Sequence, residues 1–122
     1  MLELDDIQHI LLTRTPAITG RYEFLTFDTQ DGGRAWLSEL LDLVQSAADA
    51  TETMDESRRW ITLAFTWTGL RALGVPEESL ATFPDAFREG MASRADILGD
   101  TGSCHPDNWE GGLAGDDVHA IA

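Results

Sequence analysis

The sequence predicts a mixed α+β fold, and three observations lead to this prediction. Short stretches rich in aromatic and β-branched residues, which favour strands, alternate with stretches whose apolar residues recur every three or four positions, which favour helices. Clusters of Gly, Pro and acidic residues separate these stretches. With 43% hydrophobic residues in 122, the chain is long and apolar enough to bury the core of one domain. The expected order is strand, helix, strand, a helical insertion and the start of a third strand.

The first predicted unit is a strand followed by a long amphipathic helix. Arg21–Asp28 carries bulky apolar residues and lies between Gly20 and an Asp-Gly-Gly cluster, a pattern typical of a strand. Asp31 is the expected N-cap of the helix, which is predicted to end at about Ala48. The polar stretch Asp49–Ser57 is expected to be a solvated connection. The apolar residues that predict the helix are Trp36, Leu37, Leu40, Leu41, Val44 and either Ala47 or Ala48.

A second strand and a helical insertion are predicted next. Trp60–Thr66 is rich in β-branched and aromatic residues, which favour a strand. Trp67–Leu73 has apolar residues at three-residue steps and predicts a helical turn that Gly74 ends. Pro84–Leu98 is predicted as a second long helix, because Pro suits the first turn and apolar residues recur at every fourth position before Gly99.

The last part of the chain is predicted to be a loop and the start of a strand. Asp100–Asp117 contains several Gly residues and one Pro, too many for a regular element, and Trp109 is the side chain expected to pin it. Val118–Ala122 is predicted as the third strand. A complete layer of helices on an antiparallel sheet would need a further crossover helix and a fourth strand. The 122 residues are therefore expected to be a truncated unit.

The strongest feature of the composition is its acidity. Twenty-two acidic residues stand against eight Arg and no Lys, which gives a net charge of −14. Nucleic acid and anionic membranes are not expected as partners, because both are bound through clustered cationic side chains. The sequence shows neither an apolar run long enough to span a membrane nor a recognisable secretory signal, so a cytoplasmic location is expected. A single cysteine, Cys104, excludes an internal disulfide.

The three histidines are the first candidates for metal ligation, since neutral imidazole is a common ligand of transition metals. His119 alternates with Asp117 on a predicted strand, so the carboxylate could orient the ring from the same face. A hydrogen-bonded histidine at a strand end is the simpler expectation. His9 is expected at the surface or at a domain contact, and His105 lies in the predicted loop.

Other polar residues are expected to have ordinary roles. Cys104, His105 and Asp107 are the residue types of a nucleophilic site, but neighbours in a Gly-rich loop rarely converge, so a plain loop thiol is expected. Asp116 and Asp117 could join His119 in a metal site, although the loop lacks EF-hand spacing and turn capping is the simpler role.

Tryptophan and arginine residues add one further candidate. Trp109, in a polar loop, is the candidate surface relay for electrons, whereas Trp36, Trp60 and Trp67 are expected in the core. The arginines expected to form ion pairs on predicted helices are Arg71, Arg88 and Arg94.

An ordered set of short segments resembles the N-terminal part of the DyP-type (dye-decolourising) haem peroxidases. Leu4–Gln8 reads LDDIQ, with His9 where the family pattern usually has Gly. Leu63–Thr66 reads LAFT and Gly69–Gly74 reads GLRALG. The later segments are Ala81–Pro84, Phe87–Ala92, Leu98–Asp100, Trp109 and Asp117–Ala120. They occur in the family's order over nearly the whole chain.

The resemblance implies an incomplete ferredoxin-like N-terminal half, truncated before its last helix and strand. It also implies a haem b cofactor and a reaction in which hydrogen peroxide oxidises an organic electron donor, such as a dye or a phenol. The family's distal Gly-x-x-Asp-Gly motif is not matched by Gly112–Asp117, and none of the three histidines corresponds to the axial ligand. The sequence therefore assigns no catalytic, cofactor-binding or metal-binding residue to this chain, and the isolated 122 residues are expected to be inactive.

A noncatalytic module is the alternative reading. An acidic α+β domain with unpaired strand edges and apolar helix stripes could act by associating with a second copy. A homo-oligomer is compatible with both hypotheses.

Overall fold

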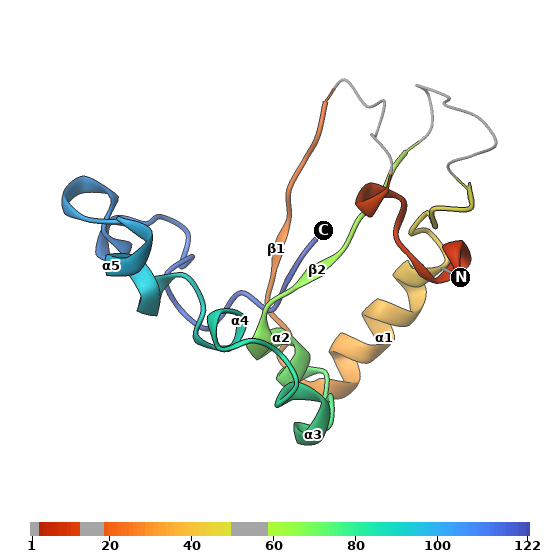
Figure 1. Cartoon of the computed structure of the whole chain (residues 1–122). Helices are drawn as coiled ribbons and strands as arrows, with labels where there is room; N and C mark the ends of the chain where they lie inside the picture. The colour runs from red at the N-terminus through yellow and green to blue at the C-terminus, as the bar shows by residue number, and fades with distance from the viewer. Residues whose placement is uncertain (1–2, 13–18, 50–58) are drawn as a thin grey trace.

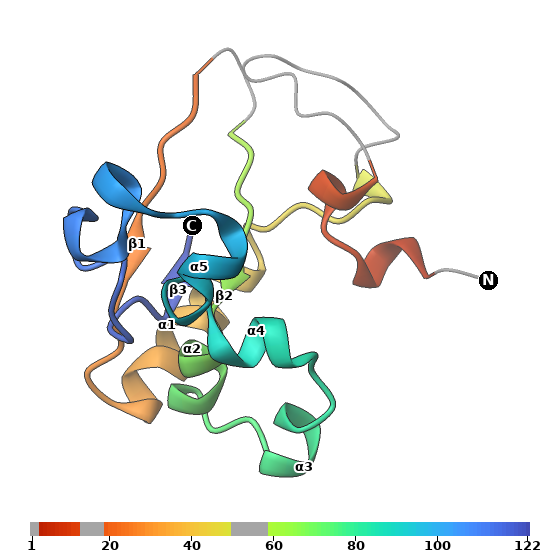
Figure 2. The same cartoon turned by 60° about the vertical axis from the view of Figure 1, so that its left-hand side comes forward.

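The structure is a computed structural model that describes residues 3–12, 19–49 and 59–122 around a three-stranded antiparallel sheet (Figure 1). The strands are β1 (Phe24–Leu25), β2 (Ala64–Phe65) and β3 (Ala120–Ile121). Their order is β1-β3-β2, so the last strand lies between the first two, as Figures 1 and 2 show from two sides. The predicted α+β class is confirmed.

The order of the strands explains why a helix must connect β1 to β2. Because β3 is antiparallel to both neighbours, β1 and β2 run in the same direction and need a crossover connection. Helix α1 (Gln30–Leu41) lies in that connection. The arrangement is consistent with part of a ferredoxin-like α+β fold.

The strands lie where the sequence predicts them, but their ladders are shorter than predicted. Phe24 and Ala64 both face Ile121, and Leu25 and Phe65 both face Ala120. Both outer strands pair only with β3, so its short length limits how far either ladder extends. Further hydrogen bonds continue this pairing: Glu23 N donates to Ala122 O (2.9 Å), Ala122 N donates to Glu23 O (3.0 Å) and Thr66 N donates to His119 O (3.1 Å).

Helix α1 begins and ends earlier than predicted. Its N-cap is Thr29 rather than Asp31, because the Thr29 hydroxyl accepts a hydrogen bond from the Gly32 amide at 3.1 Å. The helix ends at Leu41 rather than near Ala48. Residues 45–47 instead pair with the N-terminal segment.

The N-terminal segment consists of two 3-10 turns, η1 (Leu4–Asp6) and η2 (His9–Leu11). The amide of His9 donates to Gln45 O at 3.0 Å, and the amide of Ala47 donates to Ile7 O at 2.7 Å. These long-range bonds satisfy backbone groups that a longer α1 would have used within the helix. The predicted connection Asp49–Ser57 lies, apart from Asp49, outside the described residues.

Helix α2 (Trp67–Ala72) confirms the predicted helical turn. Its N-cap Thr66 accepts from the Gly69 amide at 3.0 Å, and Gly74 follows its last turn with a φ of 75°. A Cβ at Gly69 would lie 1.8 Å from the backbone oxygen of His119. Only glycine therefore allows α2 to approach β3 this closely. Helix α3 (Glu77–Leu80) follows after Pro76.

The predicted long helix Pro84–Leu98 is wrong as a continuous element. The chain forms α4 (Asp85–Glu89), a 3-10 turn η4 (Ala92–Arg94) and α5 (Ala95–Leu98). Gly90 separates α4 from η4 with φ 75° and ψ 173°, a conformation that no helix contains. In Figure 1 this segment lies to the left of the strands and α1 to the right.

The predicted loop Asp100–Asp117 is confirmed, since apart from turns it contains only η5 (Gly102–Cys104) and η6 (Pro106–Asn108). Trp109 pins it as predicted, because its indole Nε1 donates to Cys104 O at 2.8 Å. In the described part of the chain, no helix is long and apolar enough to cross a membrane.

The buried hydrophobic residues are few and are spread over several elements, and one close contact joins α1 to the end of α2 and to the residues after β1. Gly33 of α1 lies against Phe27 and Leu73, and the Phe27 and Trp36 rings are 5.5 Å apart. This contact fixes α1 against the connection that follows β1. The buried hydrophobic residues among those described are Ala47, Leu63, Leu73, Leu80, Ala95 and Ala120.

The contact between Gly69 and β3 predicts a large effect of one methyl group. Gly69→Ala is expected to lower the free energy of unfolding by about 3 kcal/mol, because the backbone of β3 must move to admit the side chain. Gly20→Ala is the control, since a Cβ there meets no atom within 4 Å, and it is expected to change stability by less than about 1 kcal/mol. Urea unfolding measures both. Equal stabilities of the two variants would contradict this packing.

Candidate functional site

An apolar hollow of about 660 Å³ lies on one face of the sheet. Phe24, Ala64 and Ile121 stand opposite one another in the register, so their side chains share this face. Tyr22 and Phe24 are 79% and 51% exposed. None of the described residues that line the hollow is charged; they are Gln8, Ile10, Leu11, Tyr22, Phe24, Thr62, Leu63, Ala64, Ile121 and Ala122.

Gln8 fixes the margin of this hollow. Its side-chain Nε2 donates to Leu63 O at 2.9 Å and its Oε1 accepts from Leu63 N at 2.8 Å. The amide side chain thus pairs with the backbone ahead of β2 as a neighbouring strand would. This pairing places Ile10 and Leu11 of η2 beside the sheet. Sequence reasoning missed the role, since the two residues are far apart in the chain and no spacing links them.

His119 is a structural junction rather than a free ligand. Its ring Nδ1 accepts a hydrogen bond from the Phe27 amide at 2.8 Å, and the two rings are 5.5 Å apart. An imidazole that accepts at Nδ1 is neutral and carries its proton on Nε2. The predicted orienting partner, Asp117, is exposed, and its backbone oxygen accepts from the Thr26 hydroxyl at 2.5 Å. The group that orients the ring is therefore the Phe27 amide.

The backbone of His119 also joins both outer strands. Its amide donates to Leu25 O at 2.7 Å, and its oxygen accepts from Thr66 N at 3.1 Å. The Thr66 hydroxyl donates to Val118 O at 2.7 Å while it caps α2. One residue thus links β1, β2 and the start of α2.

The expectation that His9 lies at the surface is wrong. His9 has no exposed surface, and its ring lies 4.5 Å from the Trp60 ring at an angle of 40°. The pairing of residues 7–9 with residues 45–47 draws the side chain under the N-terminal segment. His9 is therefore part of the packing. Its acidic neighbours in the sequence did not indicate this burial.

The loop residues Cys104, His105 and Asp107 do not form a buried catalytic group. Cys104 is exposed, as expected of a loop thiol. His105 Nδ1 lies 3.3 Å from a carboxylate oxygen of Asp107 and 3.3 Å from its backbone amide, so the ring closes the start of η6. Trp109 binds the loop backbone through its indole N–H and is half-buried.

The hypothetical metal site of Asp116, Asp117 and His119 is not formed. In the described ranges, no group of three or more His, Cys, Asp or Glu side chains lies close enough to hold a metal ion. His119 directs Nδ1 to Phe27, and both aspartates are exposed.

The tryptophans and arginines differ in part from their expected roles. Trp36, Trp60 and Trp67 are half-buried rather than fully in the core. Arg71 lies over the Trp67 ring, 4.9 Å from its centre, so within the described ranges it makes a cation–π contact in place of the expected ion pair. The predicted ion pairs do form elsewhere: Arg88 pairs with Asp85, and Arg94 lies 3.7 Å from Glu89.

The described residues do not fit the axial ligation of a haem. His9 is fully buried against Trp60, and the hollow has no histidine in its lining. His119 uses Nδ1 internally, and His105 belongs to an exposed turn. The hollow also offers no cation for an acidic haem side chain, since the described residues that line it are uncharged. The chain's chemistry at this site is apolar packing.

Comparison with known proteins finds a sequence similarity to a peroxidase. It is similar to Peroxidase 2 of Mycetinis scorodonius, with 29% identity over 121 residues. The match covers 98% of this chain and 23% of that protein, so the chain spans less than a quarter of the length of this relative. No family model matches the chain.

The His119 junction predicts how two substitutions differ. His119→Ala is expected to destabilise the fold by about 1–3 kcal/mol, because the Phe27 amide loses its acceptor in a half-buried position. His119→Asn is expected to lose less, since the amide oxygen of asparagine is an acceptor two bonds from Cβ, near the position of Nδ1. Urea unfolding of the three proteins measures the difference. If both variants lose the same stability, the ring acceptor contributes nothing.

Proposed function

We propose that this chain is the N-terminal part of a haem peroxidase of the DyP type, which oxidises organic donors such as dyes or phenols with hydrogen peroxide. The observation that carries the proposal is the extent of the similarity to Peroxidase 2, which covers 98% of the chain rather than one local motif. A sheet with β3 between β1 and β2 supports it, because the resemblance to the DyP-type family implies a ferredoxin-like half.

In this proposal the chain is framework rather than catalyst. His9 and His119 are engaged in packing and hydrogen bonding, and His105 lies in an exposed turn. The haem ligand and the distal residues that handle hydrogen peroxide are proposed to lie in polypeptide outside these 122 residues. Haem in such an enzyme supplies the redox chemistry, while this segment supplies a folded sheet and its apolar face.

The proposal predicts different behaviour for the chain and for the complete protein. The complete protein, expressed with haem, is expected to show a Soret band and to oxidise a dye or phenol only when hydrogen peroxide is present. The 122-residue chain is expected to show neither, because its histidines are engaged elsewhere. The assay follows loss of dye absorbance, with the peroxide omitted as the control.

Two results would contradict this proposal. A complete protein that folds but binds no haem is not a haem peroxidase. A 122-residue chain that binds haem in a fixed ratio and turns over dye would show that the ligands lie within it.

The exposed hollow favours one alternative function, a noncatalytic module that associates with a second copy. Tyr22 and Phe24 are exposed, and apolar surface of this kind is typical of contact sites. Light scattering on the complete protein separates the two: a haem-free dimer that Tyr22→Glu converts to a monomer supports the module, and a haem-loaded protein supports the peroxidase.

A further inference from the structure

The break at Gly90 is held by backbone conformation rather than by packing. Gly90 has φ 75° and ψ 173°, a region that is essentially restricted to glycine. A Cβ built there meets no atom within 4 Å. A methyl side chain at this position would therefore meet no neighbour, and the dihedral preference of glycine is what permits the break.

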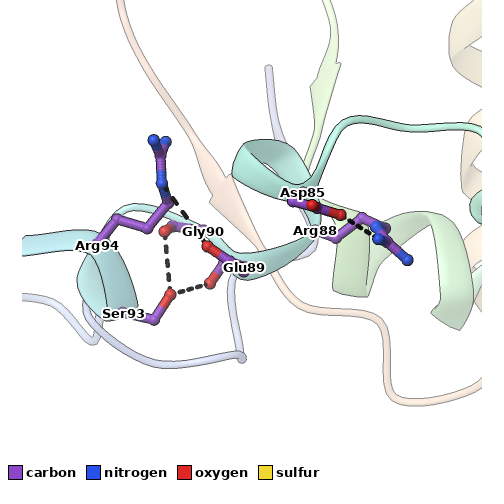
Figure 3. Close-up of polar contacts among 6 residues, drawn as sticks. All are labelled: Asp85, Arg88, Glu89, Gly90, Ser93 and Arg94. Carbon is purple, nitrogen blue, oxygen red and sulfur yellow. Dashed lines mark hydrogen bonds and ion pairs between the residues drawn. The ribbon is translucent and has the colours of Figure 1, made fainter. Parts of the chain in front are cut away.

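Ser93 takes over hydrogen bonds that a continuous helix would make through its backbone. Its hydroxyl donates to Glu89 O at 2.5 Å and to Gly90 O at 3.2 Å, as Figure 3 shows. In an uninterrupted α-helix these two oxygens would accept from the amides of Ser93 and Arg94. The Arg94 amide donates instead to Met91 O at 3.1 Å. One hydroxyl proton, shared between the two oxygens, thus replaces part of the hydrogen bonding that the break removes.

An ion pair also spans the break. Arg94 Nε lies 3.7 Å from a carboxylate oxygen of Glu89, five positions earlier (Figure 3). Residues five apart do not face each other on a straight helix, so this pair favours the broken state. The pair of Asp85 and Arg88 lies within α4, where three-residue spacing suits a helix, and it favours neither state.

We infer that residues 85–98 are a two-state element, which exchanges between the broken form and one continuous helix. The continuous form would gain backbone hydrogen bonds and align Phe87, Met91 and Ala95 on one stripe. In the broken form Met91 is 63% exposed and Ala95 is 6% exposed, so the stripe is divided. The exchange changes the direction in which the chain leaves α4 towards the loop and β3. This inference does not depend on the proposed peroxidase function.

Amide hydrogen exchange of the full chain, read by mass spectrometry, tests the inference. Gly90→Ala removes the residue that permits the break, and Ser93→Ala removes the hydroxyl that caps it. Both are expected to slow exchange of the amides of residues 91–94, by about tenfold for Gly90→Ala and less for Ser93→Ala, because these amides enter a helix. Gly99→Ala is the matched control. It also replaces a glycine with positive φ and open space around its Cβ, but leaves the break in place.

Unchanged or faster exchange of residues 91–94 in both variants would overturn the inference. If Gly90→Ala fails to fold, Ser93→Ala decides alone: slower exchange supports a second helical state, and unchanged or faster exchange excludes it. Slower exchange in Gly99→Ala to the same degree would also overturn it, since the effect would then come from losing any glycine.

Discussion

The attachment of β3 between β1 and β2 is the constraint on which the described structure depends, and His119 contributes to it through its amide, its backbone oxygen and its ring. Its amide and oxygen bond to Leu25 and Thr66 at 2.7 and 3.1 Å, and its ring accepts from Phe27 at 2.8 Å. These contacts join residues that are 53 or more positions apart, and the entropy lost in closing such loops must be offset by the bonds and by burial of the core. Gly69 has no side chain, which allows the backbone at His119, next to β3, to pack closely against α2. Helix α2, the crossover through α1 and the apolar face of the sheet all follow from this placement.

The local patterns in the sequence predict the order and type of the elements, and the long-range contacts set their ends. The strand positions and the glycine stop after α2 follow from β-propensity and from the loss of helical conformation at Gly74. Pairing of the N-terminal segment with residues 45–47 ends α1 at Leu41, which periodicity alone does not show. The same pairing buries His9. Gly90 interrupts an apolar repeat that otherwise satisfies the criteria for a helix, because the repeat records which residues are apolar and not which dihedrals the backbone adopts.

The candidate site shows that the presence of reactive residue types in a sequence does not by itself establish a function. Imidazole, thiol and carboxylate groups occur in the chain, yet the structure uses His119 and His9 for hydrogen bonding and aromatic packing. The structure also contains an open sheet face whose described lining residues are uncharged, on a strongly acidic protein. The proposed role as framework within a larger peroxidase is compatible with the structural use of these histidines, and it rests on the match to Peroxidase 2, which has 29% identity over nearly the whole chain.

The protonation state of the His119 ring is the most direct measure of this account, since a structural junction and an available ligand require different hydrogen bonding. Nitrogen-15 NMR of the histidine side chains reports which ring nitrogen carries the proton and whether the other is coupled to an amide. The account predicts a neutral ring with its proton on Nε2 and an Nδ1 that is hydrogen-bonded to the Phe27 amide. A proton on Nδ1, with no coupling to Phe27, would contradict it and would return His119 to the set of possible ligands.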